Sequence, residues 1–336
     1  MGLAGRTDRV AITLCPWAVI LQHRGIALIF GLFLTGLALI ATLGCVFAPR
    51  IWLMDLVVHF RLQYAALALA GGVILAVSGE PWIAAFAFLI AATNALIATP
   101  LLFSRRSCER PAGNEHTAAI RIASINVFYR NRQHRRVVDF IARERPDAVV
   151  LVEINGEWER ALDAVDQEYA YRYTARGKRG KGITLLSRWP LLAAGMLPGY
   201  SDVQSALAAT LEIHGRRIEL LGIHTTWPMG RRRSGLRNQQ LRFLGEFARA
   251  HEQPLVIVGD LNVSPFSAHF QGLLAAGHLK SAAQGRGWQP TWPTFMPLGG
   301  IQIDHALTNP AVAVTSFRRG APVGSDHRPI IIEFFL

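Results

Sequence analysis

The stretch LVIVGDLN at residues 255–262 decides the fold of this chain. Its first five residues, Leu255–Gly259, form an apolar run of the kind expected for a β-strand that is covered on both faces. Asp260 and Asn262 follow at the point where this strand would end. A buried strand that ends in a carboxylate and an amide predicts a polar site at the edge of a β-sheet.

Other polar residues stand at the ends of apolar runs in the last two-thirds of the chain. They are Glu153 in VVLVEI, His224 in LLGIHT, Asp304 in IQIDHAL, and Asp326 and His327 in GSDHRP. Oxygen ligands suit Mg²⁺, and a histidine held by an aspartate can move protons near neutral pH. The pattern therefore predicts a metal-dependent phosphoesterase.

Short apolar runs alternate with helical patterns over residues 118–336, which predicts an α/β domain. Two of these runs flank HGRR and predict an antiparallel hairpin. We expect two stacked mixed β-sheets flanked by helices, a four-layer αββα sandwich. The expected strands are Ile120–Val127, Ala148–Glu153, Ile183–Ser187, Ala206–Ile213, Ile218–His224, Leu255–Gly259, Ile303–Thr308 and Pro329–Phe335. The expected helices are Arg135–Arg143, Glu157–Val165, Gly235–His251 and Ala268–Ala276.

The first hundred residues contain three apolar stretches that predict transmembrane helices, at about 25–48, 62–79 and 81–103. The first has no charged residue, and at about 1.5 Å per residue it is long enough to cross a ~30 Å hydrocarbon core. A cleaved secretory signal is disfavoured because this stretch is too long and two more follow it.

The chain divides by composition into an anchor over residues 1–103, a polar linker over 104–117 and a catalytic domain over 118–336. We expect an integral protein of a bacterial-type inner membrane. Three crossings place the N-terminus and the large domain on opposite sides. The arginines near the helix ends are divided too evenly to fix which side each occupies.

Charge distinguishes the second part of the chain. Residues 1–103 hold five of the 35 basic and three of the 23 acidic residues, so residues 104–336 carry a formal charge of +10. This excess suggests an anionic partner, such as nucleic acid, phosphorylated headgroups or a membrane surface. The three cysteines offer neither a disulfide framework nor a cysteine-rich metal site. No protein partner can be inferred.

Six short motifs occur in order along the domain. They are SIN at 124–126, VEI around Glu153, GIHT around His224, GDLN at 259–262, IDH at 303–305 and GSDHRP at 324–329. Together they resemble the endonuclease/exonuclease/phosphatase superfamily, whose members include deoxyribonuclease I, exonuclease III, sphingomyelinases and inositol-phosphate phosphatases. The resemblance covers roughly residues 118–336 and implies hydrolysis of phosphate esters.

The resemblance also implies a metal site. Glu153 resembles the principal Mg²⁺ ligand of the family, with Mn²⁺ as a possible substitute ion. Asp326 resembles a carboxylate near the metal, and Asn126 resembles an amide that organises metal and phosphate. Phe128 stands where some members carry a further acidic ligand, which favours one metal ion over two.

Catalytic roles follow from the same resemblance. His327 resembles the catalytic histidine, and Asp304 resembles the aspartate that holds that imidazole in the right tautomer. Asp260 resembles the residue that positions or deprotonates the attacking water, and Asn262 resembles an amide donor to the phosphoryl oxygens. His224 stands where abasic-site endonucleases carry a tyrosine, whereas deoxyribonuclease I and sphingomyelinase-like branches carry histidine.

Substrate contacts are expected from residues close to these motifs. The basic stretches TARGKRGKG (174–182) and MGRRRSGLR (229–237), with Lys178 and Arg231, would form either a cradle for an anionic substrate or a solvated surface. Trp227 closely follows the GIHT motif and is a further candidate for substrate contact.

The sequence as a whole predicts a membrane-anchored, Mg²⁺-dependent phosphoesterase that hydrolyses phosphodiester bonds in nucleic acid or in phospholipid headgroups. Membrane lipid is then a second partner. The alternative is a catalytically silent membrane-bound module that binds polyanions or headgroups. The enzyme is favoured because every expected catalytic position carries a competent side chain.

Overall fold

The computed structural model describes residues 16–103, 119–177, 181–200, 206–296 and 298–336. The chain forms two compact units. The first consists of Met1–Thr42 and Tyr64–Asn94, and the second consists of Leu43–Gln63 and Ala95–Leu336.

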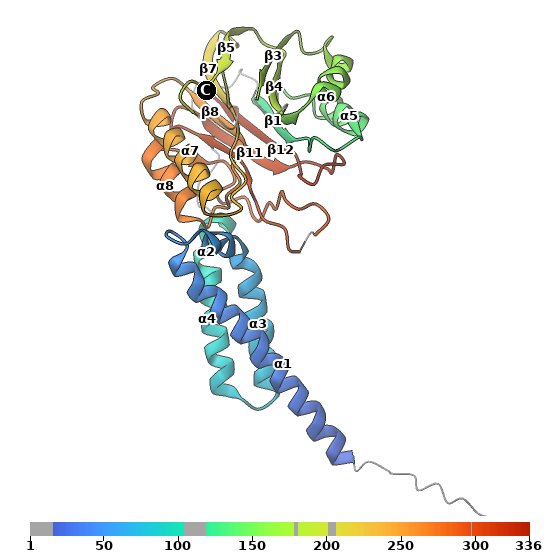
Figure 1. The fold of residues 1–336 in the computed structure, drawn as a ribbon, viewed down its shortest axis with the longest axis vertical. Helices are drawn as coiled ribbons and strands as arrows, with labels where there is room; N and C mark the ends of the chain where they lie inside the picture. Colours follow the sequence, from blue (N-terminus) through green and yellow to red (C-terminus); the bar gives the residue numbers. More distant parts are fainter. Residues whose placement is uncertain (1–15, 104–118, 178–180, 201–205, 297) are drawn as a thin grey trace, which may run out of the picture. The chain divides into compact units, whose positions relative to one another are not determined.

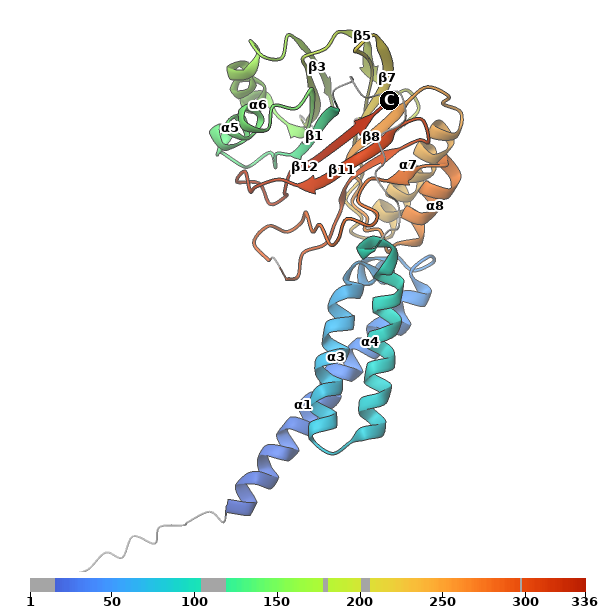
Figure 2. The same ribbon diagram turned by 180° about the vertical axis from the view of Figure 1, so that it is seen from behind.

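The first unit is built from the long apolar helices. These are α1 (Pro16–Gly44), α3 (Arg61–Val77) and α4 (Pro81–Leu102), and they lie side by side in both views (Figures 1 and 2). Three helical segments, His23–Phe47, Trp52–Val77 and Pro81–Leu102, are long and apolar enough to cross a membrane. The expectation of three such helices is confirmed.

Small residues allow the three helices of this unit to approach one another. Ala38 of α1, Ala68 of α3 and Ala91 of α4 are buried in one apolar cluster. Asn94 is buried as well, and its side-chain amide donates hydrogen bonds to Thr42 Oγ1 at 2.8 Å and to the Ile90 carbonyl. The buried side-chain NH₂ group of Asn94 therefore finds its hydrogen-bond acceptors within the helical unit.

The second unit contains two six-stranded mixed sheets, as expected. The first has the order β11 (Ala313–Arg319), β12 (Ile330–Phe335), β1 (Ile120–Asn126), β2 (Ala148–Ile154), β4 (Gly182–Ser187), β3 (Tyr171–Arg176). The second has the order β5 (Leu191–Met196), β6 (Ala206–Ile213), β7 (Arg216–His224), β8 (Leu255–Asp260), β10 (Asp304–Thr308), β9 (Lys280–Ser281).

Three apolar clusters show that the layers are stacked as αββα. One cluster joins the facing sides of the two sheets, for example Val150 of β2 and Val258 of β8. A second packs α5 (His134–Glu144) and α6 (Gly156–Ala161) on the outer face of the first sheet. A third packs α7 (Arg231–Arg249) and α8 (Ala268–Gly277) on the outer face of the second. Both helix pairs are visible in Figure 1.

The second unit also includes a segment that precedes the sheets by many residues. It contains a turn of 3-10 helix (Cys45–Phe47), the short helix α2 (Trp52–Val57) and a second 3-10 turn (Val58–Phe60). These residues fall within the range expected for the anchor, yet they cluster with the sheet-containing unit.

Candidate active site

Strand pairing brings several of the polar residues together at one end of the central strands β7, β8 and β10 of the second sheet. β7 and β8 are parallel neighbours, and their register places His224 beside Asp260. β8 and β10 are antiparallel, so the end of β8 lies against the beginning of β10 and Asp260 lies beside Asp304. Residues far apart in the sequence therefore share one location because of sheet topology.

The glycine of GDLN is required by the backbone. Gly259 has φ of 143°, a conformation that residues with a Cβ rarely adopt. A Cβ built on it would lie 1.8 Å from the carbonyl oxygen of Ile223 in the neighbouring strand. Glu153 and Asn262 also have positive φ, of 65° and 47°. Such conformations in residues other than glycine cluster at functional sites.

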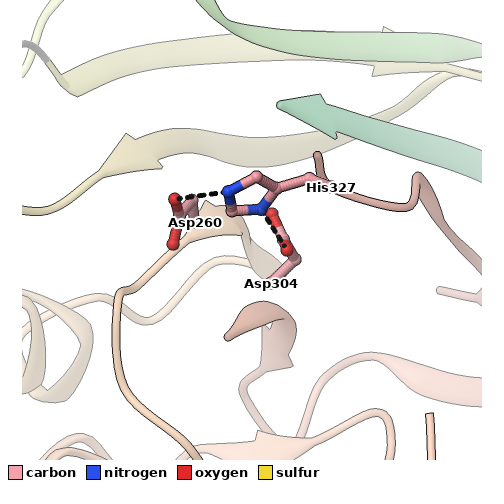
Figure 3. A group of neighbouring side chains, drawn as sticks. All are labelled: Asp260, Asp304 and His327. Carbon is pink, nitrogen blue, oxygen red and sulfur yellow. Dashed lines mark hydrogen bonds and ion pairs between the residues drawn. The ribbon is translucent and has the colours of Figure 1, made fainter. Parts of the chain in front are cut away.

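His327 lies between two carboxylates, as Figure 3 shows. Its Nδ1 is 2.8 Å from Asp304 Oδ2, and its Nε2 is 3.8 Å from Asp260 Oδ2. Burial disfavours the charged imidazole, but Asp304 and Asp260 outweigh burial and raise the pKa of His327 to about 10. The ring is therefore a cation near neutral pH, oriented by Asp304.

Asp260 is buried and receives hydrogen bonds on both oxygens. Asn126 Nδ2 donates to Oδ2 at 3.2 Å, and the backbone N–H of Asn262 donates to Oδ1 at 2.9 Å. His224 Nε2 lies 3.7 Å from Oδ2. Burial raises the pKa of Asp260 to about 7, with His327 opposing the shift. A carboxylate with such a pKa can accept a proton near neutral pH.

Glu153 accepts hydrogen bonds from Lys181 Nζ at 3.2 Å and from the Tyr129 backbone N–H at 3.3 Å. Its other oxygen is 3.8 Å from His224 Nε2. Burial opposes ionisation, yet His224 and Lys181 lower the pKa of Glu153. Burial lowers the pKa of His224, so Lys181 is the permanent cation beside this carboxylate.

Lys181 was not singled out by the sequence analysis as an individual residue. It belongs to the basic stretch that was recognised, and its ammonium group also lies 3.6 Å from the centre of the Tyr129 ring. The signal that would have found it is its position directly before β4, a strand that pairs with the Glu153 strand. Lys178, which was expected to contact substrate, lies outside the described residues.

Two further predicted residues, Asn262 and Asp326, form hydrogen bonds with residues outside the group of Asp260, Asp304 and His327. Asn262 is buried, and its side-chain amide donates to the Thr225 carbonyl at 3.1 Å. Asp326 accepts a hydrogen bond at 3.2 Å from the indole N–H of Trp292. The Trp292 ring is also 6.5 Å from the His327 ring.

The basic stretch at 229–237 lies mostly in α7, which begins four residues before the helix start expected at Gly235. Arg231 begins α7, which continues the chain after Gly230 with φ of 95°. Trp227 is 55% exposed, and the guanidinium of Arg233 lies 5.9 Å from its ring centre. Both side chains are thus available at the surface beyond the end of β7.

The donor atoms at the site are those that a hard divalent cation needs. Asp260, Asp304 and His327 each have one possible ligand atom, and these atoms lie within 4.8 Å of one another. With a pKa of about 10, however, His327 is protonated near neutral pH and has no lone pair for a metal ion, so the carboxylate and amide oxygens are the ligands available. Glu153 holds a cationic group already, the ammonium of Lys181. Carboxylate and amide oxygens therefore fit a metal of the Mg²⁺ type, and Asn126 Oδ1 is an additional oxygen that accepts from the Phe128 N–H.

Solved structures share this fold over about two-thirds of the chain. A 3′ phosphatase from Neisseria, bound to a product DNA hairpin, has a TM-score of 0.55 and 21% identity, covering 65% of this chain and 100% of its own. TDP2 from D. rerio with a single-strand DNA product has a TM-score of 0.56 and 18% identity, covering 65% and 100%. Sphingomyelinase C from Streptomyces griseocarneus has a TM-score of 0.50 and 18% identity, covering 65% and 99%.

Sequence comparison gives the family. A search of curated protein sequences found no match. The model of the Endonuclease/Exonuclease/phosphatase family matches residues 123–327, which is more than half of the chain and spans every predicted catalytic residue. With two six-stranded sheets and the polar strand ends in place, the chain belongs to the endonuclease/exonuclease/phosphatase family.

Proposed function

We propose that this protein is a membrane-anchored, Mg²⁺-dependent phosphoesterase that hydrolyses phosphodiester bonds. One observation carries the proposal: the buried His327 imidazole is hydrogen-bonded to Asp304 and directs its other nitrogen toward Asp260. A histidine oriented in this way beside a second carboxylate is suited to acid–base chemistry at a polar, solvent-poor centre.

The chain's own residues divide the chemistry. Asp260 holds and deprotonates the attacking water, because its raised pKa makes it a proton acceptor near neutrality. His327 presents a proton on Nε2 to an oxygen of the phosphoryl group, while Asp304 stabilises the imidazolium. As the water oxygen bonds to phosphorus, the bond from phosphorus to the leaving-group oxygen breaks, and that oxygen takes up a proton from solvent. Asn126, whose amide donates to Asp260, fixes the orientation of that carboxylate. These groups are aligned before the substrate binds, which reduces reorganisation in the transition state.

Glu153, Asn126 and Asp326 would hold the metal ion. When bound, Mg²⁺ supplies positive charge that neutralises the phosphoryl oxygens as negative charge develops on them. Lys181 lies beside Glu153 and provides a second positive charge in the same region.

Two features of the chain bear on the substrate class, the apolar helices and the positive charge of the domain. Three apolar helices support a substrate at or near a bilayer, such as a phospholipid headgroup, while the formal charge of +10 on residues 104–336 is also compatible with nucleic acid. The structural neighbours include proteins named for both kinds of substrate, a 3′ phosphatase with DNA and a sphingomyelinase.

The test is hydrolysis of bis-p-nitrophenyl phosphate by the full chain in detergent, with Mg²⁺ or with EDTA. We expect turnover only with Mg²⁺, and we expect His327→Ala to abolish it while the fold measured by circular dichroism is retained. Turnover in EDTA, or full turnover by His327→Ala, would remove the proposal. A panel of single- and double-stranded DNA, RNA, sphingomyelin and phosphatidylinositol phosphates then assigns the substrate. Absence of turnover on the whole panel, with retained polyanion binding, favours the silent module.

A further inference from the structure

A buried arginine contacts the loop that follows Asp260, the last residue of β8. Arg237 of α7 is fully buried, and its Nη1 donates to the carbonyl of Asn262 at 2.8 Å. Its Nε donates to Asn238 Oδ1 at 2.7 Å, and its Nη2 donates to Asp55 Oδ2. Burial lowers the pKa of Arg237, and Asp55 counteracts that shift. The guanidinium therefore connects Asp55 to the backbone of the loop at residues 261–267.

The segment containing α2 holds this loop at two further points. Ser267 Oγ donates to Asp55 Oδ1 at 2.6 Å, and Ser267 is also the N-cap of α8. His59 Nδ1 lies 2.8 Å from Ser264 Oγ. In the sequence, Asp55 and His59 lie between α1 and α3, in the N-terminal part of the apolar segment Trp52–Val77. Ser264 and Ser267 thus contact α2 and its following turn directly, and Asn262 is connected to Asp55 through Arg237.

Arg237 contacts the loop at Asn262, a residue with a left-handed backbone conformation. Asn262 has φ of 47°, in the left-handed region that asparagine adopts more readily than most residues with a Cβ. Its N–H donates to Asp260 Oδ1, while its carbonyl accepts from Arg237. The position of the Asp260 carboxylate is therefore linked, through one residue, to a guanidinium that is ion-paired with Asp55.

We propose that Asp55 and Arg237 are positioning residues for the active site: Asp55 fixes Arg237, and Arg237 fixes the backbone of Asn262 and with it Asp260. The segment between α1 and α3, at residues 45–60, then contributes to the active site as well as connecting the two helices. This inference rests on the proposed phosphoesterase function of the same site.

The first test compares Asp55→Asn with wild type in the full chain in detergent. The amide keeps the shape of the side chain but removes the charge that holds Arg237. We expect kcat to fall, up to about 10²-fold as for a small misplacement of a reacting group, while KM changes by less than about twofold because substrate contacts are unaltered. The matched control is Asp139→Asn, which alters an exposed ion pair with Arg135 and should leave both constants unchanged.

A double variant separates positioning from stability. Asp55→Leu alone leaves Arg237 buried without its counter-ion and should lower the melting temperature strongly. Asp55→Leu combined with Arg237→Met replaces the pair by apolar side chains, which should restore the melting temperature but not kcat. If kcat recovers together with the melting temperature, the pair is only structural and the proposal is overturned.

Amide hydrogen exchange provides a measurement that does not depend on activity. In Asp55→Asn, residues 261–267 should exchange at least about tenfold faster than in wild type, while the strands of the first sheet exchange as before. Equal exchange and equal kcat in the two proteins would overturn the positioning role and leave the phosphoesterase proposal intact. A wild type without turnover but with the expected exchange difference would instead overturn the proposed function alone.

Discussion

His327 Nδ1 lies 2.8 Å from Asp304 Oδ2, although the two residues are 23 positions apart. Asp304 begins β10 and its backbone N–H donates to Thr291 Oγ1 at 3.1 Å, so the carboxylate is presented from a fixed strand end. A carboxylate can only accept, which places a proton on Nδ1 and leaves Nε2 facing Asp260. The pair therefore fixes both the tautomer and the direction of the imidazole.

The first prediction concerns this pair. Asp304→Asn should lower kcat by roughly 10²–10⁴-fold, because an amide neither stabilises the imidazolium nor selects the correct tautomer. KM should change little. Hydrolysis of bis-p-nitrophenyl phosphate measures both constants. Asp163→Asn, at an exposed carboxylate paired with Arg172, is the control. Wild-type turnover in Asp304→Asn would contradict the assignment of the pair.

Glu153→Gln should weaken metal binding. The substitution keeps the size of the side chain and removes the negative charge beside Lys181, so the Mg²⁺ concentration for half-maximal turnover should rise on the order of tenfold or more. A Mg²⁺ titration of turnover provides the measurement. Glu157→Gln, four residues later on the exposed surface of α6, should titrate as wild type does. Superimposable titrations for Glu153→Gln and wild type would exclude Glu153 as a ligand.

The strands that were predicted from the sequence are central in their sheets, and the strands that were missed lie at the sheet edges. All eight expected strands are present, because each is central in its sheet and reads as an apolar run, as with the fully buried β8. The four strands that were missed, β3, β5, β9 and β11, are the four edge strands. The longer three have partly exposed side chains, so their sequences lack the apolar runs by which buried strands are found.

Local motifs predicted the centre of the site better than its surroundings. Asn126, His224 and Asp260 end strands, Asp304 begins one and His327 lies three residues before β12. Each could be found from the apolar run beside it. Their catalytic and ligand roles remain predictions.

Trp292 and Asp55 were not predicted as parts of the site. Asp55 meets Arg237 across 182 positions of sequence, and Trp292 meets Asp326 across 34. Contacts of this kind depend on tertiary packing, which no single stretch of the sequence encodes.

The arginines at the beginning of α7 should contribute to polyanion binding. Arg231, Arg232 and Arg233 are exposed in the first helical turn, where cations interact unfavourably with the helix dipole. Replacing all three by Gln should weaken binding of double-stranded DNA and reduce the slope of log K against log salt by about 0.9 for each phosphate that the variant no longer neutralises. Fluorescence anisotropy at several salt concentrations measures this slope.

The control for that series changes the same net charge elsewhere. Arg216 and Arg217 at the beginning of β7, and Arg249 at the end of α7, lie at the opposite ends of the elements that carry His224 and Arg231. Their replacement by Gln should leave the salt slope nearer to wild type. If both triple variants behave alike, the arginines of α7 act only through net charge, as a solvated surface would.

Gly259→Ala should prevent the second unit from folding stably. A methyl group at this position would lie 1.8 Å from the Ile223 carbonyl oxygen, and φ of 143° is unfavourable for alanine, so β7 and β8 would have to separate where His224 and Asp260 meet. We expect a loss on the order of 4 kcal/mol, which is a large fraction of a typical domain's stability. Gly272→Ala in α8 is the matched control: apart from its chain neighbours and the backbone of its own helix, no atom lies within 4 Å of the added methyl group. Alanine favours the helix by about 0.5–1 kcal/mol. Chemical denaturation of both variants, followed by circular dichroism, should therefore shift in opposite directions. A Gly259→Ala protein as stable as wild type would show that the two strands can part at the catalytic edge without cost.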